Sequence, residues 1–419
     1  MTRLNSGMLP GSAAIGQRSL GDPSRSFPLL PVIVDGCPAT STDAMQYPLE
    51  IAYDYDKIDR SLFDQAPLPG LSRWAPLLPP LADGLSMGEG GTPLVDAEDF
   101  GREIGVKGRL WLKDESRNPT WSHKDRLNYC VVSAAIASEA RGIAVASSGN
   151  HGAAAAAYAA RAELPCAVIV AENMPDAYLR LITSLGAHVI ASPTESRWTV
   201  LRRIVDEAGF MPASNLTRFH TGNPYGPEGY KTIAYELFLQ LGRSVPGTVL
   251  APTGYAEMLF GVWKGFQELK TLGLTDRVPR ILSAEPATRG PLARAVSSNE
   301  PATEVNGPAS IAMGISCSVS SWRGVVALEN SRDRALTSSE ETFQDMRRRL
   351  AARGLYQEFS GVAGFAAAKE ASERGVELDG DVVAILTSTG LKDAELLAPP
   401  ENLYNLDSLD TLIAELQRT

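Results

Sequence analysis

The sequence predicts an α/β fold built on parallel sheet. From about residue 96 onward, short apolar runs alternate with segments of helical pattern. Apolar runs of about four to eight residues separated by helices are typical of β-α-β units, whose parallel strands are buried on both faces. The chain has 419 residues. At ~150 residues per domain this suggests two or three domains, with enough chain to bury a large core.

The expected elements follow this alternation along the chain. Strands are predicted over 109–115, 142–149, 166–171, 188–192, 247–254, 280–286 and 381–390. Helices are predicted over 124–141, 153–162, 177–186 and 258–273. The run 153–162 is almost all alanine, which is the best helix former and allows a helix to approach a sheet closely.

The N-terminal part has a different composition. Residues 1 to about 45 are rich in Ser, Gly and Pro, which predicts an arm or an irregular lead-in. Residues 46–95 suggest a short strand pair followed by an extended, proline-rich connector. We therefore place an N-terminal arm and connector at 1–95.

Charge and hydropathy exclude some classes of function. The chain carries 39 basic and 49 acidic residues, a net charge of −10, and its pI is about 5.1. A net negative field disfavours nucleic acid as the main partner. Mean hydropathy is −0.09 and no apolar run reaches a membrane-spanning length, so no membrane association is expected. The N-terminus lacks the apolar region of a signal peptide, and we expect a cytoplasmic protein.

The four cysteines show no metal-binding pattern. Cys37, Cys130, Cys166 and Cys317 have no C-x-x-C spacing, and two of them lie in apolar runs. We expect buried free thiols in a reducing compartment, and no metal.

Four polar turns lie where a ligand would be expected in such a fold. They are 118–126 (NPTWSHKDR), 147–152 (SSGNHG), 252–256 (PTGYA) and 387–393 (TSTGLKD), each with an apolar strand before it and a helical pattern after it. In doubly wound sheets, ligands bind at the carboxyl ends of strands, where helix N-termini present free N–H groups. Together the turns predict a polar ligand held by several loops.

These motifs in this order resemble the threonine synthase branch of the fold-type II pyridoxal-phosphate (PLP) enzymes. The segments 87–95 (MGEGGTPLV) and 222–232 (GNPYGPEGYKT) extend the likeness, which covers roughly residues 48–395. The resemblance implies two doubly wound parallel-sheet domains with the cofactor cleft between them, plus an N-terminal extension. We place the large cofactor-binding domain at 96–118 and 223–419, and a small substrate-gating domain at 119–222.

The resemblance assigns the cofactor to particular residues. Lys124 matches the Schiff-base lysine, whose amine becomes a nucleophile when desolvated. Asn150 matches the residue that hydrogen-bonds the cofactor's phenolate oxygen. Thr387 matches the hydroxyl residue facing the pyridine nitrogen. A hydroxyl there leaves that nitrogen largely neutral, which favours elimination and replacement over transamination or racemisation.

The resemblance also assigns the loops that would bind the substrate and the cofactor phosphate. Ser147, Ser148 and His151 would grip the substrate carboxylate, and Gly149 would permit the tight turn. The cofactor phosphate would sit at Gly254, Tyr255 and Ala256, where a helix N-terminus favours an anion. The remaining motif lysines, Lys113, Lys231 and Lys392, are expected to be structural or to support the site indirectly.

The phosphate loop departs from the family pattern. Threonine synthases usually have two glycines and two asparagines there, whereas this chain has Gly254 with Tyr255, Glu257 and Met258. A carboxylate beside a phosphate repels it. We therefore expect that Glu257 points away or that the loop is built differently.

Other departures concern the substrate. The family's ligands for a second phosphate are Thr, Arg and Asn, and here His151, Gly226 and Met258 take their places. Losing the arginine removes a bidentate clamp, for which nearby Arg218 or His220 would be the substitutes. Trp121 replaces a glycine and is expected to reshape the pocket. His123 is either an acid/base group or a packing residue.

The function expected from the resemblance is elimination or replacement at the β or γ carbon of a small amino acid. Lys124 would then remove the α-proton as general base. The alternatives are a true threonine synthase acting on O-phosphohomoserine and a serine/threonine dehydratase or diaminopropionate ammonia-lyase-like enzyme. A non-catalytic amino-acid sensor is a further alternative, which the presence of Lys124, Asn150 and Thr387 disfavours. We expect PLP as cofactor and a homodimer.

Overall fold

The computed structural model describes residues 7–65, 69–147, 149–172 and 174–394, together with residues 413 and 417. The strands are β1 Ala14–Ser19, β2 Ser26–Phe27, β3 Leu49–Tyr53, β4 Leu94–Asp96, β5 Leu110–Asp114, β6 Ile143–Ala146, β7 Cys166–Ala171, β8 His188–Ser192, β9 Met211–Pro212, β10 Thr248–Pro252, β11 Arg280–Pro286, β12 Ala335–Ser338 and β13 Val382–Leu386. The α-helices are α1 Glu98–Glu103, α2 Lys124–Ala137, α3 Asn150–Arg161, α4 Asp176–Ser184, α5 Arg197–Ala208, α6 Gly226–Gln240, α7 Glu257–Thr271, α8 Pro291–Ser298, α9 Trp322–Ala327, α10 Glu340–Ala351 and α11 Ala363–Glu373.

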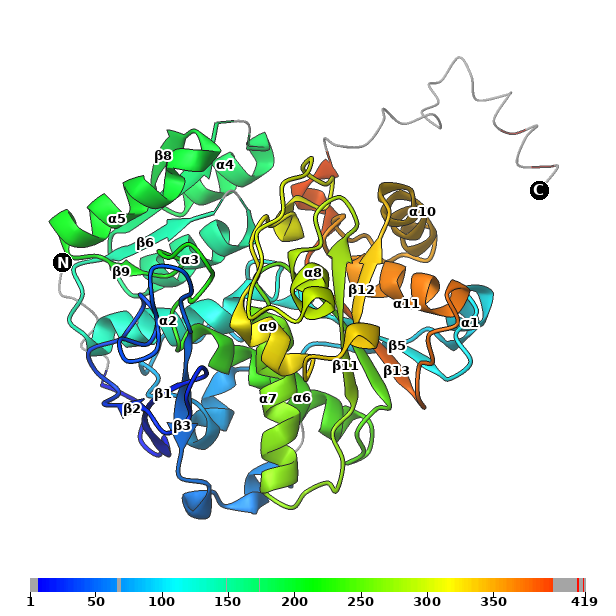
Figure 1. The fold of residues 1–419 in the computed structure, drawn as a ribbon, viewed down its shortest axis with the longest axis horizontal. Helices are drawn as coiled ribbons and strands as arrows, with labels where there is room; N and C mark the ends of the chain where they lie inside the picture. The colour runs from blue at the N-terminus through cyan, green and yellow to red at the C-terminus, as the bar shows by residue number, and fades with distance from the viewer. Residues whose placement is uncertain are drawn as a thin grey trace.

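Two parallel sheets organise the fold and confirm the predicted α/β class. The larger sheet has the order β12-β11-β10-β13-β5-β4, in which only β4 runs antiparallel to its neighbour. The smaller sheet has the order β8-β7-β6-β9 and is parallel throughout. In Figure 1 the smaller sheet lies on the left with α4 and α5, and the larger sheet lies on the right. The four strands of the smaller sheet fall inside 119–222, while the domain boundaries themselves stay a prediction.

The N-terminal region is more ordered than its composition suggested. β1 pairs antiparallel with both β2 and β3, which makes a three-stranded sheet. The expectation of an irregular lead-in up to about residue 45 is therefore wrong, because β1 and β2 lie within it, while the alternative of an N-terminal arm stays a prediction. The expected strand pair within 46–95 is also wrong, since β3 joins this sheet and β4 joins the large one. Long-range pairing, not local pattern, decides both outcomes.

Helix α6 packs against both α2 and α7. Two glycines of α6 allow the close approach to α2: a Cβ at Gly229 would lie 2.1 Å from the carbonyl oxygen of Arg126, and one at Gly226 would lie 2.9 Å from Cγ of Leu127. From residue 226 to 238, every residue of α6 is buried. This packing fixes the first turn of α2, where Lys124 lies, against the middle of the molecule.

Three further observations bear on the sequence predictions. All four cysteines are free thiols; Cys37, Cys130 and Cys166 are buried and Cys317 is half-buried. Within the described ranges, no helix is long and apolar enough to cross a membrane. In the same ranges, no cluster of three or more His, Cys, Asp or Glu side chains could hold a metal ion.

Candidate active site

Lys124 is the first residue of α2 and its amine lies among side chains from three helices. The Lys124 side chain is 19% exposed, and its Nζ lies 3.6 Å from Oε2 of Glu257, the first residue of α7. Nζ also lies 5.6 Å from the ring centroid of Tyr230 in α6. The amine is therefore accessible to a small molecule but sits within the protein.

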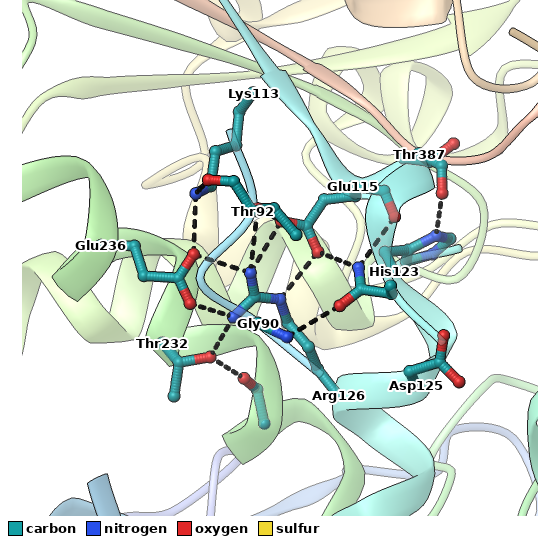
Figure 2. A network of polar contacts seen from close by, with 12 residues as sticks. Gly90, Thr92, Lys113, Glu115, His123, Asp125, Arg126, Thr232, Glu236 and Thr387 are labelled. Atoms are coloured by element: carbon teal, nitrogen blue, oxygen red, sulfur yellow. Dashed lines mark hydrogen bonds and ion pairs between the residues drawn. The ribbon is translucent and has the colours of Figure 1, made fainter. Parts of the chain in front are cut away.

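A buried charge network anchors this end of α2 (Figure 2). The guanidinium of Arg126 donates to both carboxylate oxygens of Glu115, at 2.7 and 2.8 Å, and to both of Glu236, at 2.6 and 2.8 Å. Lys113 donates to Glu236 at 2.7 Å. Burial alone raises the pKa of Glu236, but the charges of Arg126 and Lys113 outweigh it and hold the pKa well below its usual range. Two cations balance two anions, so the network is neutral and fully paired.

Asn150 lies at the centre of a second polar cluster. Its Oδ1 accepts from Nζ of Lys392 at 2.6 Å and from the hydroxyl of Ser388 at 3.0 Å. Its Nδ2 donates to Glu358 at 2.8 Å, and the hydroxyl of Tyr178 donates to the other oxygen of Glu358 at 2.8 Å. These contacts connect α3 and α4 with the end of β13 and the turn before α11.

The charges in this cluster are perturbed by burial. Burial lowers the pKa of Lys392 to about 8, although the carboxylates of Glu358 and Asp125 oppose the shift. Burial, with a further contribution from Asp393, raises the pKa of Glu358. Sequence reasoning missed Glu358, which lies in no motif. Lys392, which lies in the TSTGLKD motif, was expected to be structural or to support the site indirectly, and its contact with Asn150 fits the second of these roles.

Thr387 follows β13 and is buried, with 2% of its surface exposed. Its carbonyl oxygen accepts from the backbone N–H of His123 at 3.0 Å and lies 3.2 Å from Nδ1 of the same residue (Figure 2). The hydroxyl that contacts Asn150 belongs to the next residue, Ser388. The role of the Thr387 hydroxyl toward a pyridine nitrogen stays a prediction.

Three histidines near Lys124, of which His151 and His220 are buried and His123 is half-buried, have lowered pKa values, which favours their neutral forms. Burial, and then the charge of Lys124, lower the pKa of His151 to about 3. The same two causes hold the pKa of His123 well below its usual range. Burial and the charges of Arg323 and Lys124 do the same for His220. The ring of His123 stacks on Tyr230, with centroids 5.5 Å apart, and its role as an acid/base group or a packing residue stays a prediction.

Several buried polar atoms near Lys124 lack a partner within the described part of the chain. They are Oγ of Ser122, Oδ1 of Asn128, Nε2 of His151, Nδ1 of His220 and the hydroxyl of Tyr230. Buried polar atoms are nearly always hydrogen-bonded in folded proteins. Their concentration around one lysine is what a site for a polar ligand requires.

The start of α7 combines an anion-binding feature with a carboxylate. The preceding residue, Ala256, has φ of 62° and its carbonyl accepts from Phe260, so the N–H groups of the first turn have no partner within the helix. Tyr255 stacks on His220 with centroids 4.3 Å apart. A Cβ at Gly254 would lie 3.1 Å from Sγ of Cys317. The carboxylate of Glu257 turns toward Lys124; the expectation that it points away from the phosphate, or that the loop is built differently, stays a prediction.

The predicted substrate loop is described only in part. The N–H of Ser147 donates to the carbonyl of Ile169 at 2.9 Å, and Ser148 lies outside the described residues. Gly149 has φ of −156° and ψ of −142°, outside the usual extended region, and the role expected of it in the turn stays a prediction. The glycine that the fold requires here is Gly152, where a Cβ would lie 2.8 Å from the carbonyl oxygen of Ser147.

Trp121 adopts a conformation that suits glycine. Its φ is 60° and its side chain is half exposed. Its N–H donates to Asn118 at 2.8 Å, and its carbonyl accepts from Thr389 at 3.2 Å. A positive φ is costly for a bulky residue, which gives a physical reason for the glycine that the family has at this position. Whether Trp121 reshapes a pocket stays a prediction.

The positions that would hold a second phosphate carry no cation. Gly226 is packed against Leu127, so a longer side chain there requires movement of α2 or α6. Met258 is buried. Arg218 is exposed and pairs with Glu304 at 3.2 Å, so it does not replace the missing arginine.

The residues present fit a PLP cofactor, with one exception. An accessible lysine, unpartnered buried polar atoms, the Asn150 cluster and a helix N-terminus are the features that this cofactor needs. The carboxylate of Glu257 at the start of that helix is the exception. Fold and site together fit one class of protein, the α/β enzymes that use a carbonyl cofactor.

Comparisons with known proteins agree with this class of enzyme. A family model described as pyridoxal-phosphate dependent enzyme matches residues 85–388. Threonine synthase of Methanosarcina acetivorans is 30% identical over 359 residues, covering 83% of this chain and 86% of that protein. Threonine synthase of Mycobacterium bovis is 34% identical over 314 residues, covering 73% and 83%. The crystal structure of a threonine deaminase from T.th. is 26% identical, with a TM-score of 0.58, and covers 71% of this chain and 92% of that one.

The chain therefore belongs to the pyridoxal-phosphate dependent enzyme family, and it is related to threonine synthases and to threonine deaminase. The predicted family and cofactor are confirmed. Which reaction the protein catalyses depends on the residues around Lys124.

Proposed function

We propose that the protein catalyses elimination or replacement at the β or γ carbon of a small amino acid. The observation that carries the proposal is the position of Lys124, whose amine is accessible and lies among neutral histidines. When bound, PLP supplies an electron sink that makes the α-proton of an amino acid acidic. Lys124 then serves as the covalent attachment point and, once released, as the base that takes this proton.

The neighbouring residues bind the cofactor and the substrate. Asn150, held by Lys392 and Ser388, orients the cofactor ring, and Thr387 faces its nitrogen. The N–H groups at Gly254, Tyr255 and Ala256 hold its phosphate. The loop of Ser147, Ser148, Gly149 and His151 holds the substrate carboxylate, with Trp121 and His123 on the other side. Each of these roles is a proposal supported by the family resemblance and by the positions of the described residues.

A dehydratase or ammonia-lyase activity is the version of this function that the structure favours over threonine synthesis. The packed glycine at position 226 and the surface ion pair of Arg218 leave a second phosphate without a clamp. The relationship to threonine deaminase, at 26% identity, adds support. A true threonine synthase is the alternative, supported by the two relatives of that name.

One assay distinguishes these activities. The purified holoenzyme is incubated with serine, threonine, 2,3-diaminopropanoate or O-phosphohomoserine, and the products are identified. Release of ammonia with a 2-oxo acid supports the proposal. Release of phosphate with threonine at a faster rate contradicts it and establishes the threonine synthase. A protein that binds amino acids and turns over none of them is the non-catalytic alternative.

We also propose that the enzyme is a cytoplasmic homodimer. The support is its family, whose relatives here are metabolic enzymes. Light scattering on the purified protein gives the mass in solution, and a value near 44.8 kDa, that of one chain, contradicts the dimer.

A further inference from the structure

Lys392 is a buried cation whose hydrogen bonds go to uncharged groups. It is 5% exposed, and its Nζ donates to Oδ1 of Asn150 and to the carbonyl oxygen of Thr120, each at 2.6 Å. In the buried lysines Lys113 and Lys231, Nζ instead lies 2.7 and 2.8 Å from a glutamate oxygen. Buried charges are usually paired directly, so Lys392 differs from the lysines that stabilise the fold.

These contacts fix which way round the Asn150 amide lies. An ammonium group only donates hydrogen bonds, so the amide atom that faces Lys392 is the oxygen. The hydroxyl of Ser388 donates to the same oxygen at 3.0 Å. The amide nitrogen therefore points the other way, where it donates one hydrogen to Glu358 at 2.8 Å. An amide nitrogen carries two hydrogens, and these contacts leave the second one for a ligand.

Glu358 supplies a negative charge on the other side of the same amide. Its buried carboxylate accepts from the hydroxyl of Tyr178 as well as from Asn150. The amide therefore has a cation at its oxygen and an anion at its nitrogen. Burial lowers the pKa of Lys392 to about 8, and the charge of Glu358 opposes this shift. Glu358 thus favours the ammonium form of Lys392 across the amide.

The charge of Lys392 makes the second N–H of Asn150 a stronger hydrogen-bond donor. A cation at an amide oxygen draws electron density away from the nitrogen, and successive hydrogen bonds along such a chain strengthen one another. The family resemblance places the phenolate oxygen of the cofactor against Asn150. That oxygen carries negative charge, and hydrogen bonds to a charged acceptor are the stronger kind. A strengthened donor therefore stabilises it.

We infer that Lys392 is a positioning residue, which turns Nδ2 of Asn150 toward the cofactor and strengthens the hydrogen bond from Nδ2 to the phenolate oxygen; the inference rests on the proposed function. Lys392 acts on the cofactor through the amide. Its second hydrogen bond, to the carbonyl of Thr120, connects Asn150 with the loop that precedes Lys124. One cation therefore sets both the orientation of the amide and its place relative to the reactive lysine.

The test measures how much the phenolate oxygen contributes to cofactor binding. PLP and its 3-deoxy analogue, which lacks that oxygen, are each bound to the full chain freed of cofactor, and quenching of tryptophan fluorescence gives both dissociation constants. Their ratio is the preference for the oxygen, measured in wild type, Lys392→Met, Lys392→Gln and Asn150→Ala. Lys264→Met is the matched control, because Lys264 is also buried and also donates to a carbonyl oxygen at 2.6 Å, that of Ile51.

We expect Lys392→Met to lower the preference about fivefold, the difference between a hydrogen bond assisted by a charge and a neutral one. Lys392→Gln keeps a donor without the charge and should lower the preference too, which decides the question if Lys392→Met does not fold. Lys264→Met should leave the preference unchanged. Equal weakening of both cofactors in the Lys392 variants shows a merely structural lysine and overturns the inference, as does a preference that Asn150→Ala retains. If the wild type binds neither cofactor, the proposed function fails as well.

Discussion

Two groups of buried charges lie on either side of the first turn of α2, and they differ in how completely they are paired. On one side, Arg126 and Lys113 meet Glu115 and Glu236 at hydrogen-bond distance, and all four side chains are at most 2% exposed (Figure 2). On the other side, Lys124 and Glu257 are 3.6 Å apart, and the neighbouring rings of His151 and His220 each keep a nitrogen without a partner among the described residues.

The difference separates positioning from binding. A complete network of charge-assisted hydrogen bonds holds backbone elements in one arrangement, and it has no capacity left for a ligand. Incomplete pairing in a buried place is unfavourable unless a ligand completes it. The Arg126 network therefore holds the first turn of α2 in place, and under the proposed function the incompletely paired group around Lys124 is where a ligand would bind.

The largest effect is expected from removing the reactive amine. Lys124→Ala should lower turnover of the substrate found in the product assay by about 10²–10⁴-fold, the usual contribution of a positioned acid–base group. Lys107→Ala, at an exposed position, is the control. Both variants should fold, as circular dichroism would report. Activity within threefold of wild type in Lys124→Ala would remove the basis of the proposed function.

The free energy of unfolding tests the fully paired network around Arg126. Arg126→Met leaves two buried carboxylates without their main cation, so the free energy of unfolding should fall by about 3–5 kcal/mol. Arg203→Met breaks an exposed pair with Glu207 and should cost less than about 1 kcal/mol. Urea denaturation measures both. Equal losses in the two variants would show that the buried network does not hold α2 in place.

The pH dependence of the unfolding free energy tests the incompletely paired group around Lys124. The pKa of His151 is about 3 in the folded protein, against about 6.5 in the unfolded chain. The unfolded state therefore takes up a proton first, so the stability contribution present above pH 6.5 is lost as the pH falls toward 3. The slope is about 1.4 kcal/mol per pH unit. His151→Gln should remove this slope from the unfolding free energy, with His188→Gln, at an exposed site, as control. Parallel curves for wild type and His151→Gln would contradict a neutral, buried His151.

Seven strands of the two parallel sheets could be predicted from sequence as continuous apolar runs, whereas β4, β9 and β12, each of at most four residues, were missed. The predicted strand 166–171 has the bounds of β7, and 280–286 has those of β11. β1 could not be predicted, since AIGQRS is short and largely polar and its partner β3 lies some thirty residues away. The residues of α6 matched a motif but showed no helical periodicity, because the helix is buried on all sides.

The site was predictable where a motif carried it and not where distant residues meet. Lys124 and Asn150 come from the motifs at 118–126 and 147–152. The contact of Arg126 with Glu236 joins residues 110 positions apart, and that of Asn150 with Glu358 joins residues 208 apart. The sequence identified Glu257 as a departure, but its direction depends on the position of Lys124 in another helix.

The central claim is that Lys124 is the amine that holds the cofactor. The protein is loaded with PLP, reduced with borohydride and digested, and the modified peptide is identified by mass spectrometry. We expect a single modified residue, Lys124, and no modification of the buried lysines Lys113, Lys231, Lys264 and Lys392. Modification at one of those lysines instead, or no modification at all, would contradict it.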